Sequence, residues 1–266
     1  MNSRILIHAA FAAALVSPVP GFAESSSWVE TPGGKVRLLL DVPQEPAKVL
    51  RGAIEIDLAE GWKTYWREPG DAGVPPQLDL SASSNVTQSK IAFPAPQRFE
   101  DGQTQWAGYK HSVVLPVTFN VEKPDAPTRL KGHVFLGICE TICIPVQAEF
   151  DLDVKPGKKD ALAHTLVSTA FDRLPQPASP AFGIREAALE GGKAVFDITL
   201  PAGGQPAELF LSSGAITFAT PKFEGAGEDG ARFSSDILRG AGNTPAEVDY
   251  TLVQGDQAVS GKVELQ

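Results

Sequence analysis

Short runs of apolar residues, separated by Pro, Gly, Asp and Asn, fill the chain from Ser27 onward and predict β-strands. In the first half these runs are Val36–Val42, Ala53–Leu58, Val113–Val121 and His133–Gly137. In the second half they are Ala194–Leu200, Glu208–Ser212, Ile216–Ala219, Glu247–Val253 and Ala258–Leu265. The 22 prolines and 25 glycines argue against a helical bundle. The pattern therefore predicts an all-β protein, and polar and apolar alternation in the second half favours a small sandwich there.

One segment, Lys158–Leu174, has the spacing of a helix instead. Its apolar residues at every fourth position are Leu162, Leu166, Ala170 and Leu174, and Val167 and Phe171 widen the stripe. The Pro-rich stretch at residues 175–180 cannot continue a helix and forms a stiff extended connection. We therefore predict a short helix and a Pro-rich linker over residues 158–180, with a domain on either side.

The N-terminus has the features of an export signal. Arg4 supplies the positive charge, and Ile5–Val16 is an apolar stretch of 12 residues interrupted only by His8. The small residues at Gly21–Ala23 form a cleavage site, and we predict cleavage after Ala23. A membrane anchor would need about 20 apolar residues. Residues 1–23 are therefore predicted to be a signal peptide, and the mature chain to be exported.

The charge of the chain excludes some classes of partner. The formal net charge is -9, and removal of residues 1–23 deletes one Arg and no acid, which makes it -10. An acidic chain with dispersed charges is not expected to bind nucleic acid or an anionic membrane. The mature length suits two ordinary domains or one large β domain, and the Pro-rich break between the two strand-rich halves favours two.

The chain holds only two cysteines, Cys139 and Cys143, four positions apart. In an oxidising compartment they are expected to form a disulfide. In the chain-entropy model, a disulfide that closes a loop of about 5 residues stabilises the fold by roughly 2 kcal/mol, against about 3 kcal/mol for a loop of 15 residues. A structural brace would stabilise more if it joined distant strands. The position favours a reactive disulfide, and a structural hairpin disulfide remains the alternative.

Aromatic residues gather in the same half as the cysteines. All four tryptophans lie there, and the densest segment is 61–76, which contains Trp62, Tyr65 and Trp66. These side chains could simply fill a sandwich core, or one of them could shield the cysteines or receive a partner. The second half has no Cys, His or Trp, so we predict that it is a support or docking domain.

Several motifs resemble one known family. They are Gly61–Pro76, Phe93–Phe99, Gly108-Tyr109 before Leu115–Val117, and Gly137–Pro145 around the two cysteines. In this order they resemble the periplasmic N-terminal region of the DsbD/ScsB thiol-disulfide reductases, over residues 28 to 155. The three-residue gap between the cysteines is closer to the ScsB branch, the suppressor-of-copper-sensitivity proteins.

The resemblance implies two successive immunoglobulin-like β-sandwich domains, at residues 24–157 and 181–266. It implies that Cys143 forms the mixed disulfide with a partner and that Cys139 resolves it. A loop at about Phe99–Trp106 would cover the pair at rest, with Phe99 or Trp106 as the shielding aromatic. No cofactor and no bound metal are implied.

Full-length relatives continue into a polytopic membrane domain and often a thioredoxin-like domain. We therefore expect a separate membrane electron donor of the DsbD/ScsB type and a thioredoxin-like acceptor, with this chain as a periplasmic component of a protein-disulfide reductase. Glu140 between the thiols, in a strand context without a helix N-terminus, does not favour the thiolate. We therefore expect slow, partner-selective exchange.

Two other functions stay open from the sequence. One is a non-catalytic adaptor domain. The other is Cu(I) binding in copper tolerance, because soft thiolates such as those of reduced Cys139 and Cys143 select Cu(I). The sequence offers no third ligand close to them: Met1 leaves with the signal, and His111, His133 and His164 are scattered singly.

Overall fold

The computed structural model describes residues 25–70, 73–102, 104–155, 157, 160–203, 206–227 and 230–266. The predicted signal peptide at 1–23 lies outside these residues. Among the described residues there are many strands and a single helix, α1, so the all-β prediction is confirmed. No helix in this part of the chain is both long and apolar enough to cross a membrane.

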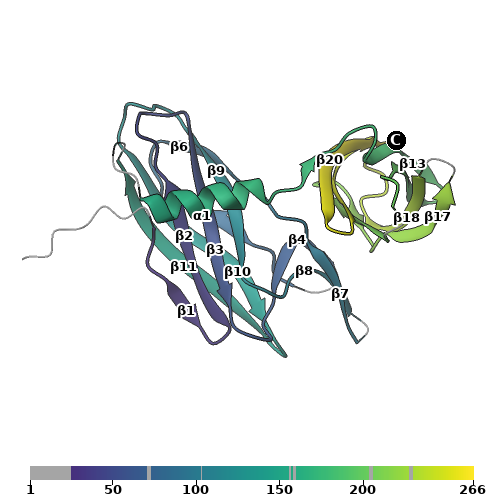
Figure 1. Cartoon of the computed structure of the whole chain (residues 1–266), viewed down its shortest axis with the longest axis horizontal. Helices are drawn as coiled ribbons and strands as arrows, with labels where there is room; N and C mark the ends of the chain where they lie inside the picture. Colours follow the sequence, from purple (N-terminus) through teal and green to yellow (C-terminus); the bar gives the residue numbers. More distant parts are fainter. Residues whose placement is uncertain are drawn as a thin grey trace, which may run out of the picture.

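The first unit is a sandwich of two antiparallel sheets (Figure 1). One sheet has the order β1 (Val29–Thr31), β2 (Gly34–Asp41), β3 (Val49–Leu58), β9 (Val113–Val121) and β6 (Val86–Ile91). The other has the order β11 (Cys143–Val154), β10 (Thr128–Cys139) and β5 (Gln77–Asp79). Alternate side chains of β2, β3, β9, β10 and β11 are fully buried between the two sheets and form one core.

A third, smaller sheet lies at the end of this sandwich that faces the second unit (Figure 1). Its order is β4 (Thr64–Gly70), β8 (Thr104–Tyr109) and β7 (Gln97–Asp101). The segment predicted as a loop, Phe99–Trp106, is therefore mostly a β-hairpin. Phe99 and Trp106 are register partners across it, and this pairing of two aromatics explains why the segment forms strands.

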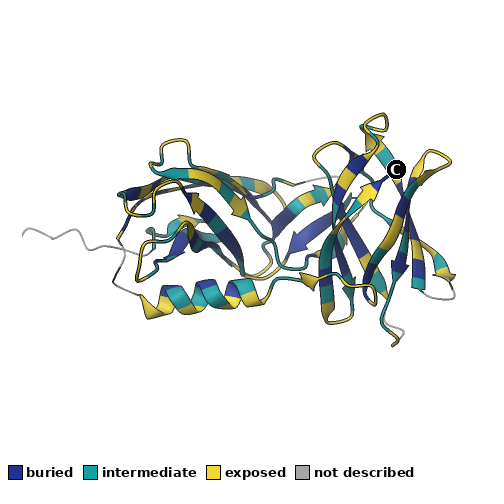
Figure 2. Cartoon of the chain, turned by 90° about the horizontal axis from the view of Figure 1, so that it is seen from above, coloured by how far each residue is buried: buried dark blue, intermediate teal, exposed yellow. Residues whose placement is uncertain are grey.

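Helix α1 (Ala161–Asp172) covers the outer face of β2, β3 and β9. It begins where the Asp160 carboxylate accepts the backbone N–H groups of Leu162 and Ala163. The buried positions are Ala163, Val167 and Ala170, and Val167 packs on the first sheet. The predicted stripe is shifted, because Leu162 is 62% exposed. Small residues on the buried side let the helix approach the sheet closely, and Figure 2 shows its exposed residues on the outer side.

The second unit is another antiparallel sandwich with its own core. One sheet has the order β12 (Gln176–Pro177), β20 (Gln257–Leu265), β19 (Ala246–Gln254) and β15 (Ala207–Ser212). The other has the order β13 (Gly183–Glu190), β14 (Lys193–Thr199), β18 (Gly230–Arg239) and β16 (Thr217–Phe218), with β17 (Lys222–Gly227) also paired to β18. Part of the Pro-rich segment thus belongs to this unit, since β12 pairs in parallel with β20.

Candidate functional site

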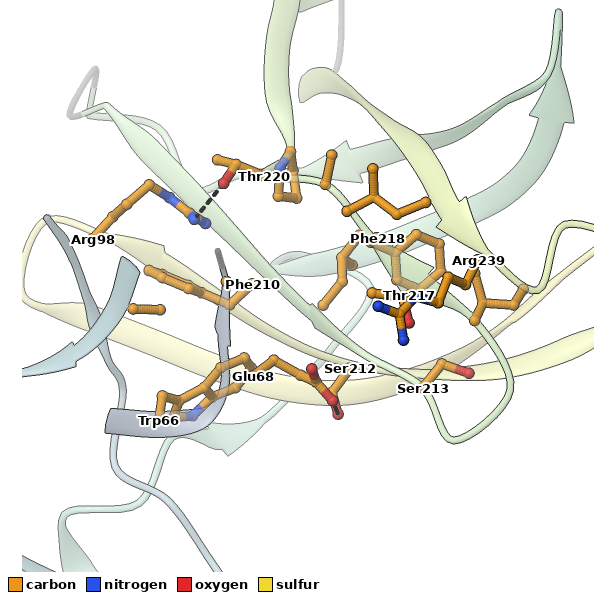
Figure 3. Close-up of a pocket in the computed structure, with 17 residues that line it drawn as sticks. Trp66, Glu68, Arg98, Phe210, Ser212, Ser213, Thr217, Phe218, Thr220 and Arg239 are labelled. Atoms are coloured by element: carbon orange, nitrogen blue, oxygen red, sulfur yellow. Dashed lines mark hydrogen bonds between the residues drawn. The ribbon is translucent and has the colours of Figure 1, made fainter. Parts of the chain in front are cut away.

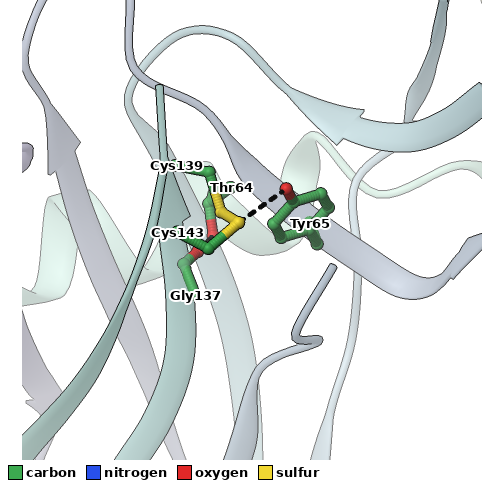
Figure 4. Close-up of a disulfide and its surroundings, with 5 residues drawn as sticks. All are labelled: Thr64, Tyr65, Gly137, Cys139 and Cys143. Carbon is green, nitrogen blue, oxygen red and sulfur yellow. Dashed lines mark hydrogen bonds between the residues drawn. A yellow bond between two sulfur atoms is a disulfide. The ribbon is translucent and has the colours of Figure 1, made fainter. Parts of the chain in front are cut away.

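The two cysteines lie at the tip of the long β10–β11 hairpin. The strands pair from Thr128 with Val154 up to Cys139 with Cys143, without a register shift. Cys139 and Cys143 are therefore direct partners, with a Cα–Cα distance of 4.0 Å, and they form a disulfide (Figure 4). The hairpin register sets this pairing, so the local fold brings the two sulfur atoms together.

The backbone of Cys139 is hydrogen-bonded to Lys63, on the side away from Cys143. Its N–H donates to the Lys63 carbonyl at 2.9 Å, and its carbonyl accepts the Lys63 N–H at 2.9 Å. In an antiparallel ladder such a residue forms a non-hydrogen-bonded pair with its partner on the other strand, and side chains of these pairs lie closest. The segment before β4 thus holds Cys139 in the position that favours the disulfide.

The two cysteines differ in exposure. Cys139 is 1% exposed, whereas Cys143 is exposed. The tip between them, Glu140 to Ile142, is exposed as well, and Ile142 is 70% exposed. In the part of the chain that the structure describes, β11 is an edge strand of its sheet, so no further strand pairs with it beside Cys143. Cys143 is therefore the more accessible residue of the pair.

Tyr65 of β4 is the side chain that contacts the disulfide through a polar atom (Figure 4). Its hydroxyl lies 3.5 Å from Cys143 Sγ. A disulfide sulfur carries no hydrogen, so the tyrosine donates. The neighbouring Thr64 fixes the start of β4 by donating from Oγ1 to the Gly137 carbonyl at 2.9 Å. The sequence pointed to the aromatic segment 61–76 but did not single out Tyr65.

A loop residue without a side chain fits against the Tyr65 ring. Gly73 has a φ of 131°, and a Cβ at this position would lie 2.5 Å from Tyr65 Cδ1. The adjacent Val74 carbonyl accepts the Gly137 N–H at 3.1 Å, which ties this loop to β10. Tyr65 is therefore packed between this loop and the β10–β11 hairpin, and it is only 2% exposed.

The two residues predicted to shield the site lie next to it. Trp106 is 2% exposed and forms one apolar cluster with Tyr65 and Cys139. Its ring meets the Tyr65 ring edge-on with centroids 5.7 Å apart. Phe99 stacks on the other side of Trp106 at 4.3 Å and is only partly buried. The geometry thus places Trp106 in one cluster with Cys139 and stacks Phe99 on the tryptophan, while the shielding role itself stays a prediction.

Charged groups near the site stack on its aromatic residues. Lys63 Nζ lies 4.5 Å from the centroid of the Trp106 ring, and Lys110 Nζ lies 4.3 Å from that of Phe99. Such contacts stabilise the rings where they are and leave positive charge at the rim. The Glu140 carboxylate lies on the exposed tip near Gly61.

The histidines lie elsewhere in the described structure. His133 is on β10 with Nδ1 3.9 Å from Asp79, and His164 is on α1 with Nδ1 2.9 Å from Asp41. Among the described residues there is no group of three or more His, Cys, Asp or Glu side chains arranged to hold a metal ion.

Comparisons with known proteins agree with this geometry. Residues 39–155 match the family model of the thiol:disulfide interchange protein DsbD, N-terminal. The structure is similar to the crystal structure of the N-terminal periplasmic domain of ScsB from Proteus mirabilis, with a TM-score of 0.73 and 20% identity over 91% of this chain and 98% of that chain. No curated protein matches the chain by sequence.

The fold and the tip disulfide define the class of protein, a pair of immunoglobulin-like β-sandwiches carrying a cysteine pair. Within that class, residues 39–155 match the DsbD N-terminal family model, and the fold of the chain is similar to that of the N-terminal periplasmic domain of ScsB. The family match and the Cys139–Cys143 pair together support thiol-disulfide exchange as its general chemistry.

Proposed function

We propose that this chain is a periplasmic thiol-disulfide exchange protein, a component of a protein-disulfide reductase. It relays electrons from a separate membrane donor of the DsbD/ScsB type to periplasmic disulfide proteins, with a thioredoxin-like protein as acceptor. The observation that carries the proposal is the asymmetry of the hairpin tip, where Cys143 is exposed and Cys139 is 1% exposed. That asymmetry supports a mixed disulfide at Cys143 and its resolution by Cys139.

The exchange balances in two steps. A donor thiolate attacks Cys143 Sγ, the bond to Cys139 breaks, and Cys139 leaves as the thiolate. The second donor thiol, as thiolate, then attacks the mixed disulfide and releases Cys143, so that two electrons and two protons pass from the donor dithiol to this chain. In the second half of the cycle, the reduced chain passes the electrons on. The Cys143 thiolate attacks the acceptor disulfide, and Cys139 then displaces the acceptor, which restores the disulfide seen in the structure.

The location and domain limits belong to the same proposal. The apolar N-terminal segment with a small-residue site before residue 24 supports export through a cleaved signal peptide. The similarity to a periplasmic domain of ScsB supports the same compartment. We propose a redox domain at 24–157, a helix and linker at 158–180, and a second domain at 181–266, which supports the first.

Trapping of the mixed disulfide tests this function. In Cys139→Ala the partner attached to Cys143 cannot be displaced by a neighbouring thiol, so adducts should accumulate on non-reducing gels of the exported fraction. Cys143→Ala is the matched control, and it should give at least about tenfold less adduct because Cys139 is buried.

Two outcomes would contradict the proposal. Adducts in equal amounts in both variants would remove the assignment of roles. Absence of adducts in both, together with tight Cu(I) binding by the wild type that either substitution weakens to a similar degree, would instead support the copper-binding alternative.

A further inference from the structure

The β7–β8 hairpin that carries the shielding aromatics has two different faces. Neighbouring residues in a strand point to opposite sides, and this holds for Arg98 and Phe99 on β7. Phe99 packs against Trp106 beside the disulfide. Arg98 points the other way and contacts the second unit. One hairpin therefore contacts the redox site on one face and the second sandwich on the other.

In the described structure the Arg98 side chain has two hydrogen bonds and a ring contact with the second unit, and Figure 3 shows the bond to Thr220. Nη2 donates to the Leu209 carbonyl at 3.0 Å, and Nη1 donates to Thr220 Oγ1 at 3.3 Å. The guanidinium carbon also lies 4.6 Å from the centroid of the Phe210 ring. Burial lowers the pKa of Arg98, but a guanidinium stays charged in proteins, so both hydrogen bonds are charge-assisted.

The outer strand of the hairpin has a strand neighbour on one side only. Among the described residues β7 pairs with β8 alone, and β8 pairs with β4 in a ladder that is interrupted between Tyr65 and Gly70. A cavity of about 290 Å³ lies between the two units, and Arg98 of β7 is among the residues that line it. The polar contacts of Arg98 are thus well placed to set where the hairpin lies.

We propose that Arg98 is a positioning residue for exchange at the disulfide. By bonding to Leu209 and Thr220 it holds the β7–β8 hairpin so that Trp106 stays in the cluster with Tyr65 and Cys139, and this keeps thiols and water away from the Cys139 sulfur. The second sandwich therefore controls the reactivity of the first through one arginine. The biological meaning rests on the proposed function, whereas the physical coupling can be tested without any partner protein.

The test is the rate at which dithiothreitol reduces the disulfide in the folded, full-length protein. A dithiothreitol thiolate attacks Cys143 Sγ and Cys139 leaves as the thiolate; the second thiolate of the reagent then attacks the mixed disulfide and releases Cys143, so that cyclic oxidised dithiothreitol forms and two electrons pass to the protein. An opened hairpin lets water solvate the leaving Cys139 thiolate, which speeds the first step. In Arg98→Ala the hairpin loses both charge-assisted bonds, so we expect reduction about tenfold faster than in the wild type. Arg98→Lys keeps the charge but not the fork geometry, and it should give an intermediate rate.

Ser212→Ala is the matched control. It removes another bond between the units, from Ser212 Oγ to Glu68 Oε1 at 3.4 Å, that touches neither β7 nor β8. We expect its reduction rate to stay within about twofold of the wild type. Thermal melting of the oxidised variants separates local opening of the hairpin from global unfolding. If Arg98 had only a structural role, the reduction rate would rise only in variants whose melting temperature also falls. If Arg98→Ala does not fold, Thr220→Val removes one of the two bonds and should still raise the rate.

The proposal is overturned if Arg98→Ala is reduced at the wild-type rate, or if Ser212→Ala is accelerated as much as Arg98→Ala. Neither result would affect the trapping of partners at Cys143, which tests the proposed function separately.

Discussion

Tyr65 is the side chain whose contact with the disulfide gives it the most direct chemical influence. Its hydroxyl lies 3.5 Å from Cys143 Sγ, and its ring is held by Gly73 and Trp106. When the disulfide is reduced, the same hydroxyl is in place to donate to a thiolate at Cys143. A donor beside the charged form favours that form, which is the form that attacks.

Tyr65→Phe should therefore slow the reaction of Cys143 while leaving the ring packing in place. Loss of one hydrogen bond of about 0.5 to 1.5 kcal/mol predicts that alkylation of reduced Cys143 by iodoacetamide at neutral pH slows about twofold to twelvefold. Tyr109→Phe is the control, because its hydroxyl donates to the Pro94 carbonyl at 2.9 Å, away from the cysteines. Equal rates for the wild type and Tyr65→Phe would show that the hydroxyl has no part in the exchange.

The roles of single residues were only partly readable from the sequence. The spacing of Cys139 and Cys143 indicated a pair, because two cysteines only four positions apart in the chain can easily meet as a disulfide. The difference in their exposure was not readable, since it depends on β11 being the edge strand and on Lys63 bonding to the far side of Cys139. Tyr65 was missed as a contact for the same reason, because it reaches Cys143 across 78 positions of the chain.

At the scale of elements, the β10–β11 hairpin holds the cysteines without depending on them. Its strands pair along 12 residues each, and every second side chain of β11 from Val146 to Val154 is buried. The disulfide closes only the last turn of this ladder. In the chain-entropy description such a small loop adds about 2 kcal/mol, which is a modest part of the stability of a domain.

Reduction should therefore leave the protein folded. We expect tris(2-carboxyethyl)phosphine to lower the melting temperature by no more than about 8 °C, since 1 kcal/mol corresponds to about 2 to 4 °C for a protein of this size. Circular dichroism melts with and without the reductant check this, and the double variant Cys139→Ala, Cys143→Ala should not respond to it. Loss of a cooperative transition on reduction would make the disulfide a structural brace.

Hydrophobic patterning predicted some elements closely and others poorly. Strand β9 begins and ends at Val113 and Val121 as the pattern predicts, because apolar residues mark both of its ends. Strand β10 is longer than the predicted His133–Gly137 at both ends, since polar residues such as Arg129 and Lys131 continue the ladder through ion pairs with β11. The loop expected at about Phe99–Trp106 came from the family resemblance and not from patterning, and the structure has the short strands of the β7–β8 hairpin there.

At the scale of the whole molecule, the two sandwiches meet through specific contacts. Trp66 of β4 packs edge-on against Phe210 of β15 with centroids 5.7 Å apart, and Phe210 belongs to the core cluster of the first unit. Composition and proline content indicated two β domains, but contacts between residues more than 100 positions apart leave no local pattern. The link between the second unit and the redox site was therefore visible only in the structure.

The central claim is that the folded chain exchanges at Cys143, and cysteine-resolved mapping of a mixed disulfide tests it most directly. The oxidised full-length protein is mixed with glutathione under native conditions, quenched with acid within seconds, digested and analysed by mass spectrometry. The exposure of Cys143 and the burial of Cys139 predict glutathione on Cys143 in at least about tenfold excess over Cys139. Glutathione mainly on Cys139, or on neither cysteine until the protein is denatured, would contradict the account.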